Sequence, residues 1–370
     1  MRSLPAVAAS LALAAAFAAV APAADGDVNR ILARAVALHE AGDILGAIQA
    51  YQEVLALQPG SVEARSNLGA AYVRLGRHDE AIQQYRWALE RDPGNATVRF
   101  NLGLALYKSA RIPEAEEELA RVVAVQPGQK SAVLLLADCQ LKQGEDKKAV
   151  ELLAPFESSW ADDRPYAYLY GSALVRTEQV EKGQVYIDRI LRDGDSAEAR
   201  VLMGAAHLAA KDYPSALQEL RRAVELNPKL PTVQSLYGRA LMGSGDRDGA
   251  ARAFRRELEL DPNDYEANLY LGMLRKEEQR YDEALDYLGR AARMRPLDPG
   301  ARYSLGSLYV ATGKIAEARQ LLEGVVRDAP ELTQAHVLLA TVYYRLKMKE
   351  EGDRERAIVE KLTAGAQARQ

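Results

Sequence analysis

Residues 67–93 read NLGAAYVRLGRHDEAIQQYRWALERDP, and the pattern within them decides the fold. Gly69 follows a large residue, the small Ala81 comes twelve residues later, and Tyr85 and Pro93 follow in turn. Small residues let two helical backbones approach, whereas proline ends a helix because it has no N–H to donate and its ring clashes with the preceding turn. The stretch therefore predicts two antiparallel helices, A and B, closed by a proline turn.

The same pattern returns with a period of 34 residues. Prolines keep this spacing at Pro59, Pro93 and Pro127, and again at Pro228, Pro262, Pro296 and Pro330. The gap from Pro127 to Pro228 is 101 residues, one short of three periods, so it accommodates repeats without the proline. With the proline as position 32, repeats are predicted to start near residues 28, 62, 96, 130, 164, 197, 231, 265, 299 and 333. Pro231 and Pro299, at position 1, are expected in the first turn of helix A, where proline is tolerated.

These positions resemble the tetratricopeptide repeat (TPR) family: a large residue and glycine, then alanine, a large residue and proline. The resemblance covers residues 28–370 and implies an all-α solenoid, a right-handed superhelix of about ten helix-turn-helix repeats spanning 25–370. A single repeat cannot bury its own apolar face, so stability would come from stacking neighbours.

The fourth and fifth repeats depart from the pattern. Ala161 and Asp195 occupy the proline position, and Gly183 replaces the alanine. We expect a local irregularity or bend across about 155–197. The B helix of the last repeat is rich in Lys, Glu and Arg, which suits a solvated terminal cap.

Residues 1–24 have the character of an export signal. Arg2 precedes an alanine-rich apolar run, and Ala21-Pro22-Ala23 fits a small-residue cleavage site. This predicts an exported protein, most readily in the bacterial periplasm. The alternative is that residues 4–24 stay as an uncleaved anchor in the inner membrane.

Composition argues against several classes of function. Among 370 residues, 48 Lys and Arg face 52 Asp and Glu, and this charge of -4 disfavours nucleic-acid binding. One cysteine and four histidines, with no catalytic motif, predict no enzyme, no cofactor and no metal site. Cys139 is read as a packed residue, with intermolecular pairing as the alternative.

Tyrosine is in excess, with 18 Tyr against 4 Phe and 2 Trp. Some tyrosines occupy packing positions of the repeat, but others fall where the TPR resemblance places the concave face, at positions 2, 5, 9 and 12 of helix A. At position 6 of two successive repeats stand asparagines, whose amides can hold a peptide backbone. The predicted peptide-binding groove comprises Asn67, Phe100, Asn101, Leu104, Tyr107, Leu134, Leu141, Tyr168, Met242, Met273, Tyr303 and Tyr344. The alternative is that these side chains pack between repeats.

The resemblance implies a non-enzymatic scaffold that binds a protein or peptide segment in this groove, in cell-envelope assembly or secretion. The alternative is an accessory substrate-docking subunit of an envelope enzyme complex, such as a polysaccharide synthase. A third reading is a self-assembling spacer. A membrane-associated complex and a homo-oligomer both stay open.

Overall fold

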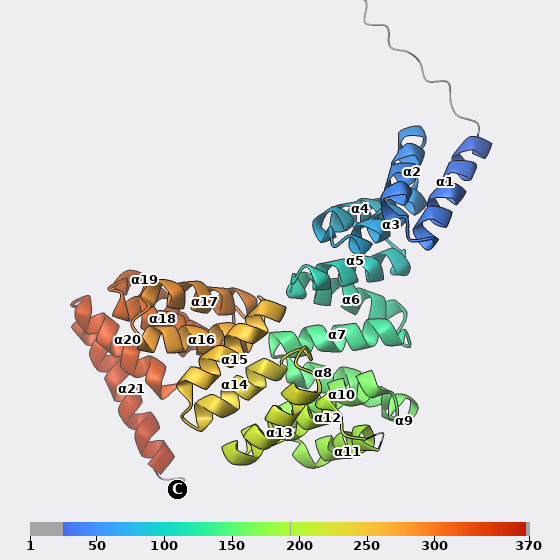
Figure 1. Cartoon of the computed structure of the whole chain (residues 1–370). Helices are drawn as coiled ribbons and strands as arrows, with labels where there is room; N and C mark the ends of the chain where they lie inside the picture. Colours follow the sequence, from blue (N-terminus) through green and yellow to red (C-terminus); the bar gives the residue numbers. More distant parts are fainter. Residues whose placement is uncertain (1–24, 193, 368–370) are drawn as a thin grey trace, which may run out of the picture. The chain divides into compact units, whose positions relative to one another are not determined.

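The structure is a computed structural model that describes residues 25–192 and 194–367, with side chains for residues 26–192 and 194–364 (Figure 1). Helices and turns make up this part of the chain, and it contains no strand. The A helices are α1 (Asp25–Glu40), α3 (Val62–Arg74), α5 (Ala96–Lys108), α7 (Lys130–Gln143), α10 (Arg164–Arg176), α12 (Ala197–Ala209), α14 (Val233–Gly243), α16 (Tyr265–Glu277), α18 (Pro299–Ala311) and α20 (Thr333–Arg345). The B helices are α2 (Ile44–Leu57), α4 (His78–Arg91), α6 (Ile112–Val125), α8 (Asp146–Leu153), α11 (Val180–Leu191), α13 (Tyr213–Leu226), α15 (Arg247–Leu260), α17 (Tyr281–Met294), α19 (Ile315–Asp328) and α21 (Lys349–Gln367). The predicted all-α repeat architecture is confirmed.

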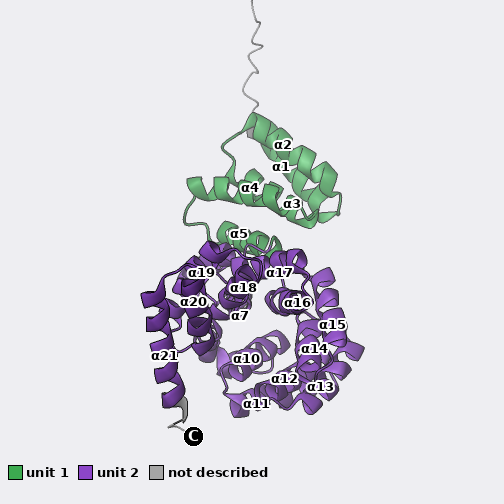
Figure 2. Cartoon of the chain, turned by 90° about the vertical axis from the view of Figure 1, so that its left-hand side faces the viewer, with its two compact units in different colours: residues 1–109 green, residues 110–370 purple. Residues whose placement is uncertain are grey.

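The chain divides into two compact units, residues 1–109 and 110–370 (Figure 2). The described part of unit 1 contains α1 to α5, and unit 2 contains α6 to α21. Within unit 2 successive helices follow one another around a ring (Figure 2).

Six of the A helices, α3, α5, α10, α12, α16 and α18, begin directly after a residue whose side chain caps the helix. Ser61 Oγ accepts a hydrogen bond from the backbone N–H of Ala64 at 3.2 Å, and Asp298 Oδ1 accepts one from Ala301 at 2.8 Å. Such caps satisfy N–H groups that have no partner inside the helix. Pro299 is the first residue of α18, as predicted.

Helix α14 is an exception to the predicted starts. It begins at Val233 rather than at Pro231, so Pro231 lies before the helix and not in its first turn. Thr232 adopts a left-handed conformation with φ 66°, which interrupts the helical backbone. Glu257 from α15 supplies the missing cap and accepts the N–H groups of Thr232 at 2.9 Å and Gln234 at 3.0 Å.

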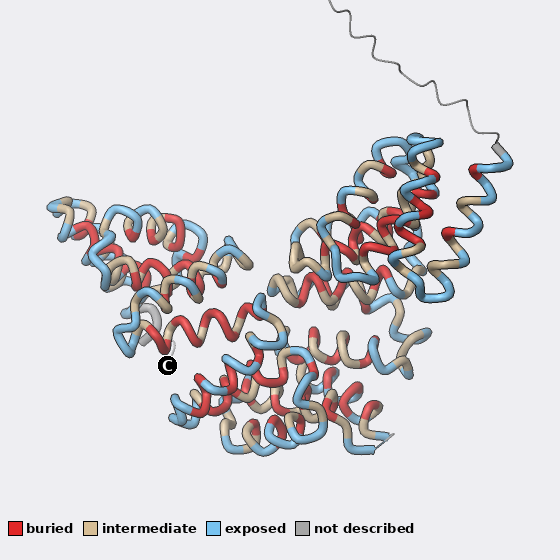
Figure 3. The backbone as a smooth tube through the Cα atoms, turned by 45° about the horizontal axis from the view of Figure 1, so that its top comes forward, coloured by how far each residue is buried: buried red, intermediate tan, exposed pale blue. Residues whose placement is uncertain are grey.

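Glycine makes room for the large residue of helix B. A Cβ on Gly69 would lie 2.7 Å from Cε1 of Tyr85, and a Cβ on Gly238 would lie 2.6 Å from Cε1 of Phe254. Tyr85 and Phe254 are buried in consequence. In Figure 3 buried residues lie along the helices and the connecting turns are mostly exposed. The core is thus a series of small clusters between neighbouring repeats.

The irregularity predicted across about 155–197 is confirmed at its start, in the fourth repeat. Helix α8 stops at Leu153, and a 3-10 turn (Ala154–Phe156) and a short helix α9 (Glu157–Trp160) take the place of its C-terminal half. The rings of Phe156 and Trp160 stack with centroids 3.9 Å apart. This stack packs against the apolar cluster of α10 and α11.

The signal or anchor predicted for residues 1–24 lies outside the described residues. In the part of the chain that is described, none of the helices has the length and apolar character needed to span a bilayer.

Candidate partner-binding surface

Five predicted groove residues lie on two neighbouring helices of unit 1. Asn67 is on α3, and Phe100, Asn101, Leu104 and Tyr107 are on α5. All five are partly buried, and α3 contacts α5 directly. The structure therefore brings these residues onto adjoining helices.

The amides of Asn67 and Asn101 are not used by the fold. Within the described residues, neither side chain forms a hydrogen bond, although both are partly buried. Each amide offers two donors and an acceptor oxygen. They are available to a ligand that presents both N–H and C=O groups.

In unit 2 three predicted groove residues are packed into apolar clusters. Leu134 packs beside the cluster that includes Tyr166, and Leu141 is only 5% exposed, clustered with Ala149 and Ala173. Tyr168 packs against two clusters. Burial raises the pKa of Tyr168 to about 12. Their role as partner contacts stays a prediction.

The remaining predicted residues lie further along unit 2. Met242, Met273 and Tyr303 are partly buried beside the clusters of their own repeats. Tyr344 is 36% exposed, and its hydroxyl donates a hydrogen bond to Asp353 Oδ1 at 2.7 Å. These residues belong to four different A helices, so the structure brings them into a series along unit 2 and not into a single cluster.

Two basic residues of these A helices were not among the predicted groove residues. Arg239 Nη1 lies 2.9 Å from Glu266 Oε1, and Lys276 Nζ donates to Ser307 Oγ at 2.7 Å. Both contacts join one A helix to the next. Burial lowers the pKa of Lys276. Arg239 and Lys276 occupy positions 9 and 12 of their repeats, so listing every residue at those positions would have found them.

The described residues offer little for metal or thiol chemistry. Within them no group of three or more His, Cys, Asp or Glu residues is arranged to hold a metal ion. Cys139 is fully buried, as its packing interpretation predicted, and burial raises the pKa of its thiol.

Solved structures similar to this chain are helical repeat proteins of low sequence identity. The crystal structure of the APC/C hetero-tetramer Cut9-Hcn1 is 15% identical, with a TM-score of 0.61, over 91% of this chain and 75% of that one. MamA from Desulfovibrio magneticus RS-1 is 23% identical, with a TM-score of 0.41, over 46% of this chain and 97% of its own. Yeast Tom70 is 14% identical, with a TM-score of 0.39, over 91% and 92%. The likeness to Cut9-Hcn1 supports the fold.

Family models identify the repeats directly. One tetratricopeptide repeat model matches residues 32–96, 168–231 and 237–299, more than half of the chain, and a second matches 76–133 and 275–342. No curated protein matches the sequence. The chain belongs to the tetratricopeptide repeat family, whose members generally bind protein partners as non-catalytic scaffolds.

Proposed function

We propose that this protein is a non-enzymatic scaffold that binds an extended segment of a partner protein along α3 and α5. The observation that carries the proposal is the pair of amides of Asn67 and Asn101, one repeat apart and without a hydrogen-bond partner within the described residues. Neither amide is among the buried atoms that lack a partner in the described part of the chain, so both are open to solvent and can exchange water for the backbone groups of a ligand.

The spacing of the amides suits a peptide backbone. Packed helices lie about 8–10 Å apart, and an extended chain advances about 3.3 Å per residue. Two asparagines one helix spacing apart would therefore contact backbone groups about three residues apart. Phe100 and Leu104, beside Asn101 on α5, offer apolar contacts to the side chains between.

The compartment proposed is the bacterial periplasm, and the process is cell-envelope assembly or secretion. The signal-like sequence of residues 1–24 supports export, and the family supports a protein partner. In an alternative form of this proposal, residues 4–24 are retained as an inner-membrane anchor and the partner belongs to a membrane-associated complex. Intact mass of the exported protein separates the two, since only the anchored form keeps residues 1–24.

Photo-crosslinking in the organism that makes the protein tests the binding surface. A photoreactive amino acid is placed at Asn67, Asn101 or Leu104, and at Gln83 and Glu90, two exposed residues of α4, as controls. We expect a partner to be captured from the α3 and α5 sites. Capture from the α4 sites alone would overturn the proposed surface.

The same experiment distinguishes the alternatives. If the captured protein is a large envelope enzyme that carries a non-peptide substrate, the chain is a docking subunit for that enzyme. A spacer that self-assembles would capture a second copy of the chain, and light scattering would then show an oligomer. A monomer that captures a different protein supports the scaffold.

A further inference from the structure

A series of arginines lies on the exposed faces of three successive B helices in unit 2. On α13, α15 and α17 the exposed arginines without an ion pair or hydrogen bond, among the residues that the structure describes, are Arg221, Arg252, Arg255, Arg256, Arg290 and Arg293. With the paired Arg222 and Arg247, these helices carry eight exposed arginines against five exposed acidic residues: Glu225, Asp248, Glu259, Asp282 and Asp286. We call the six arginines the arginine face.

The spacing of these arginines keeps their charges together. Arg252, Arg255 and Arg256 fall three or four residues apart on α15, which places them on one side of the helix. Asp248 and Glu259 lie on the same side, four residues from Arg252 and Arg255, so the three arginines there outnumber the acidic residues by one.

The three helices belong to consecutive layers of unit 2. Helix α14 packs against both α13 and α15, and α16 packs against both α15 and α17. The order of these helices around unit 2 can be followed in Figure 2. The arginine face therefore extends over three repeats.

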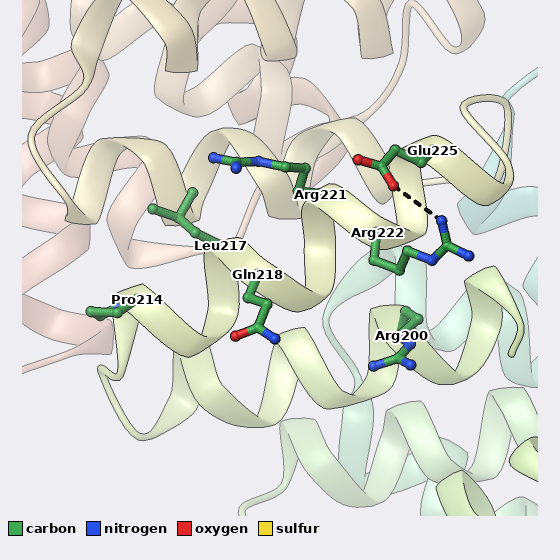
Figure 4. A pocket seen from close by; sticks show the side chains of 7 residues that line it. All are labelled: Arg200, Pro214, Leu217, Gln218, Arg221, Arg222 and Glu225. Carbon is green, nitrogen blue, oxygen red and sulfur yellow. Dashed lines mark hydrogen bonds and ion pairs between the residues drawn. The ribbon is translucent and has the colours of Figure 1, made fainter.

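A surface hollow adjoins one end of this face. The hollow has a volume of about 570 Å³ and is lined by Arg200 of α12 and by Pro214, Leu217, Gln218, Arg221, Arg222 and Glu225 of α13. Figure 4 shows that Arg221 extends along α13 away from the ion pair that Arg222 forms with Glu225. Arg200 is likewise paired, with Asp195 and Glu219. The hollow thus presents one unpaired guanidinium beside the apolar surfaces of Pro214 and Leu217.

We propose that the arginine face is a second docking surface, separate from α3 and α5, which takes an acidic protein segment with interspersed apolar residues. Guanidinium groups bind carboxylates through two parallel hydrogen bonds, and opposite charge speeds the encounter of partners. The hollow beside Arg221 accepts an apolar side chain of the same segment. The chain as a whole carries a charge of -4, so the face is a local feature and not part of a basic protein.

The test measures binding of a defined peptide to the full chain. The probe is a fluorescein-labelled 16-residue peptide in which one leucine follows every three glutamates, and the control peptide carries glutamine for glutamate. Fluorescence anisotropy is followed at low and at physiological salt. We expect the acidic peptide to bind at least tenfold more tightly than the glutamine peptide, with an affinity that falls as salt increases.

Two charge-reversal variants assign the site. The variant R221E/R255E/R256E is expected to weaken binding of the acidic peptide at least tenfold. The matched control R30E/R327E/R354E reverses three exposed arginines elsewhere and changes the net charge equally, so it is expected to weaken binding no more than threefold. Circular dichroism melts establish that both variants are folded.

Three outcomes would overturn the proposal: equal binding of both peptides, equal weakening by both variants, or tighter binding of single-stranded DNA or anionic vesicles than of the acidic peptide. The double variant N67A/N101A is expected to leave acidic-peptide binding unchanged, so this test stands apart from that of the α3 and α5 surface.

Discussion

Arg295, in the turn after α17, donates a hydrogen bond from Nε to the backbone carbonyl of Lys142 near the end of α7, over 2.8 Å and across 153 residues of sequence. Its Nη2 donates to the carbonyl of Leu141 at 3.3 Å, and its guanidinium carbon lies 3.9 Å from the ring centroid of Tyr265. Lys142 Nζ forms an ion pair with Asp261 at 3.3 Å beside it. These contacts tie the fourth repeat to the turns that follow the seventh and eighth.

Removing this contact is expected to destabilise unit 2. The C-terminal carbonyls of a helix carry partial negative charge, and hydrogen bonds to a charged donor contribute about 1.5–3 kcal/mol. We expect Arg295→Ala to lower the free energy of unfolding by about 2 kcal/mol. Urea denaturation followed by circular dichroism measures it.

The matched control is Arg293→Ala, because Arg293 is exposed and has no ion pair among the described residues. We expect a change within about 0.5 kcal/mol for this variant. Equal effects of the two substitutions would show that the contact to α7 does not stabilise the unit.

Glu257 makes stability depend on pH. Its carboxylate caps α14, and its pKa is raised to about 7 by burial first and by the neighbouring Asp264 second. A carboxyl whose pKa is higher in the folded than in the unfolded state holds its proton more tightly when folded. Its contribution is therefore complete at low pH and is lost as pH rises from about 4.5 to about 7.

In the unaltered chain, this carboxyl is expected to lower the unfolding free energy by up to about 3 kcal/mol between pH 4.5 and pH 7.5. We expect that decrease to be absent in Glu257→Gln. Urea denaturation at several pH values, compared with the unaltered chain, isolates this part of the pH dependence. Glu259→Gln, an exposed change on the same helix, should leave the pH dependence as it was. An unaltered slope in Glu257→Gln would contradict the assignment.

Gly238→Ala tests the repeat's packing. An alanine in a helix is ordinarily more stable than glycine by about 0.5–1 kcal/mol. Here the new methyl would lie 2.6 Å from Cε1 of the buried Phe254, so we expect a loss of about 1–3 kcal/mol instead. Gly128→Ala is the control, because a Cβ there meets nothing within 4 Å. A stabilised Gly238→Ala variant would show that Phe254 moves without cost.

The repeat positions made the fold predictable, because each of them recurs in many copies. Gly238 and Phe254 occupy such positions, and the structure places them in contact. The start of α14 was not predictable from the period, because it depends on the left-handed Thr232 and on the cap from Glu257. The contact of Arg295 with Lys142 was also beyond the pattern, since residues 153 apart share no local signal.

The burial of individual residues in the candidate site was not predictable from the sequence, for a similar reason. The repeat assigns Leu141 to the concave face, but its burial is decided by Ala149 and Ala173 on neighbouring helices. Asn67 and Asn101 were identifiable from sequence because they share one position in successive repeats. That the fold leaves both amides unpaired required the structure.

The two tryptophans allow the two units to be followed separately. Trp87 lies in unit 1, with the guanidinium carbon of Arg91 3.4 Å from its ring centroid, and Trp160 lies in unit 2, stacked on Phe156. In the Trp160→Phe variant the remaining Trp87 reports the unfolding of unit 1 by its fluorescence. In the Trp87→Phe variant the remaining Trp160 reports the unfolding of unit 2.

Arg295→Ala is introduced into each single-tryptophan background, and fluorescence is followed during urea denaturation. We expect the unfolding midpoint reported by Trp160 to fall, because Leu141, Lys142 and Tyr265, the partners of Arg295, all belong to unit 2. The midpoint reported by Trp87 should stay within error, since repeat arrays transmit stability mainly between nearest neighbours. Equal shifts of both midpoints would mean that the chain unfolds as a single cooperative unit, and that the effect of Arg295 is not confined to unit 2.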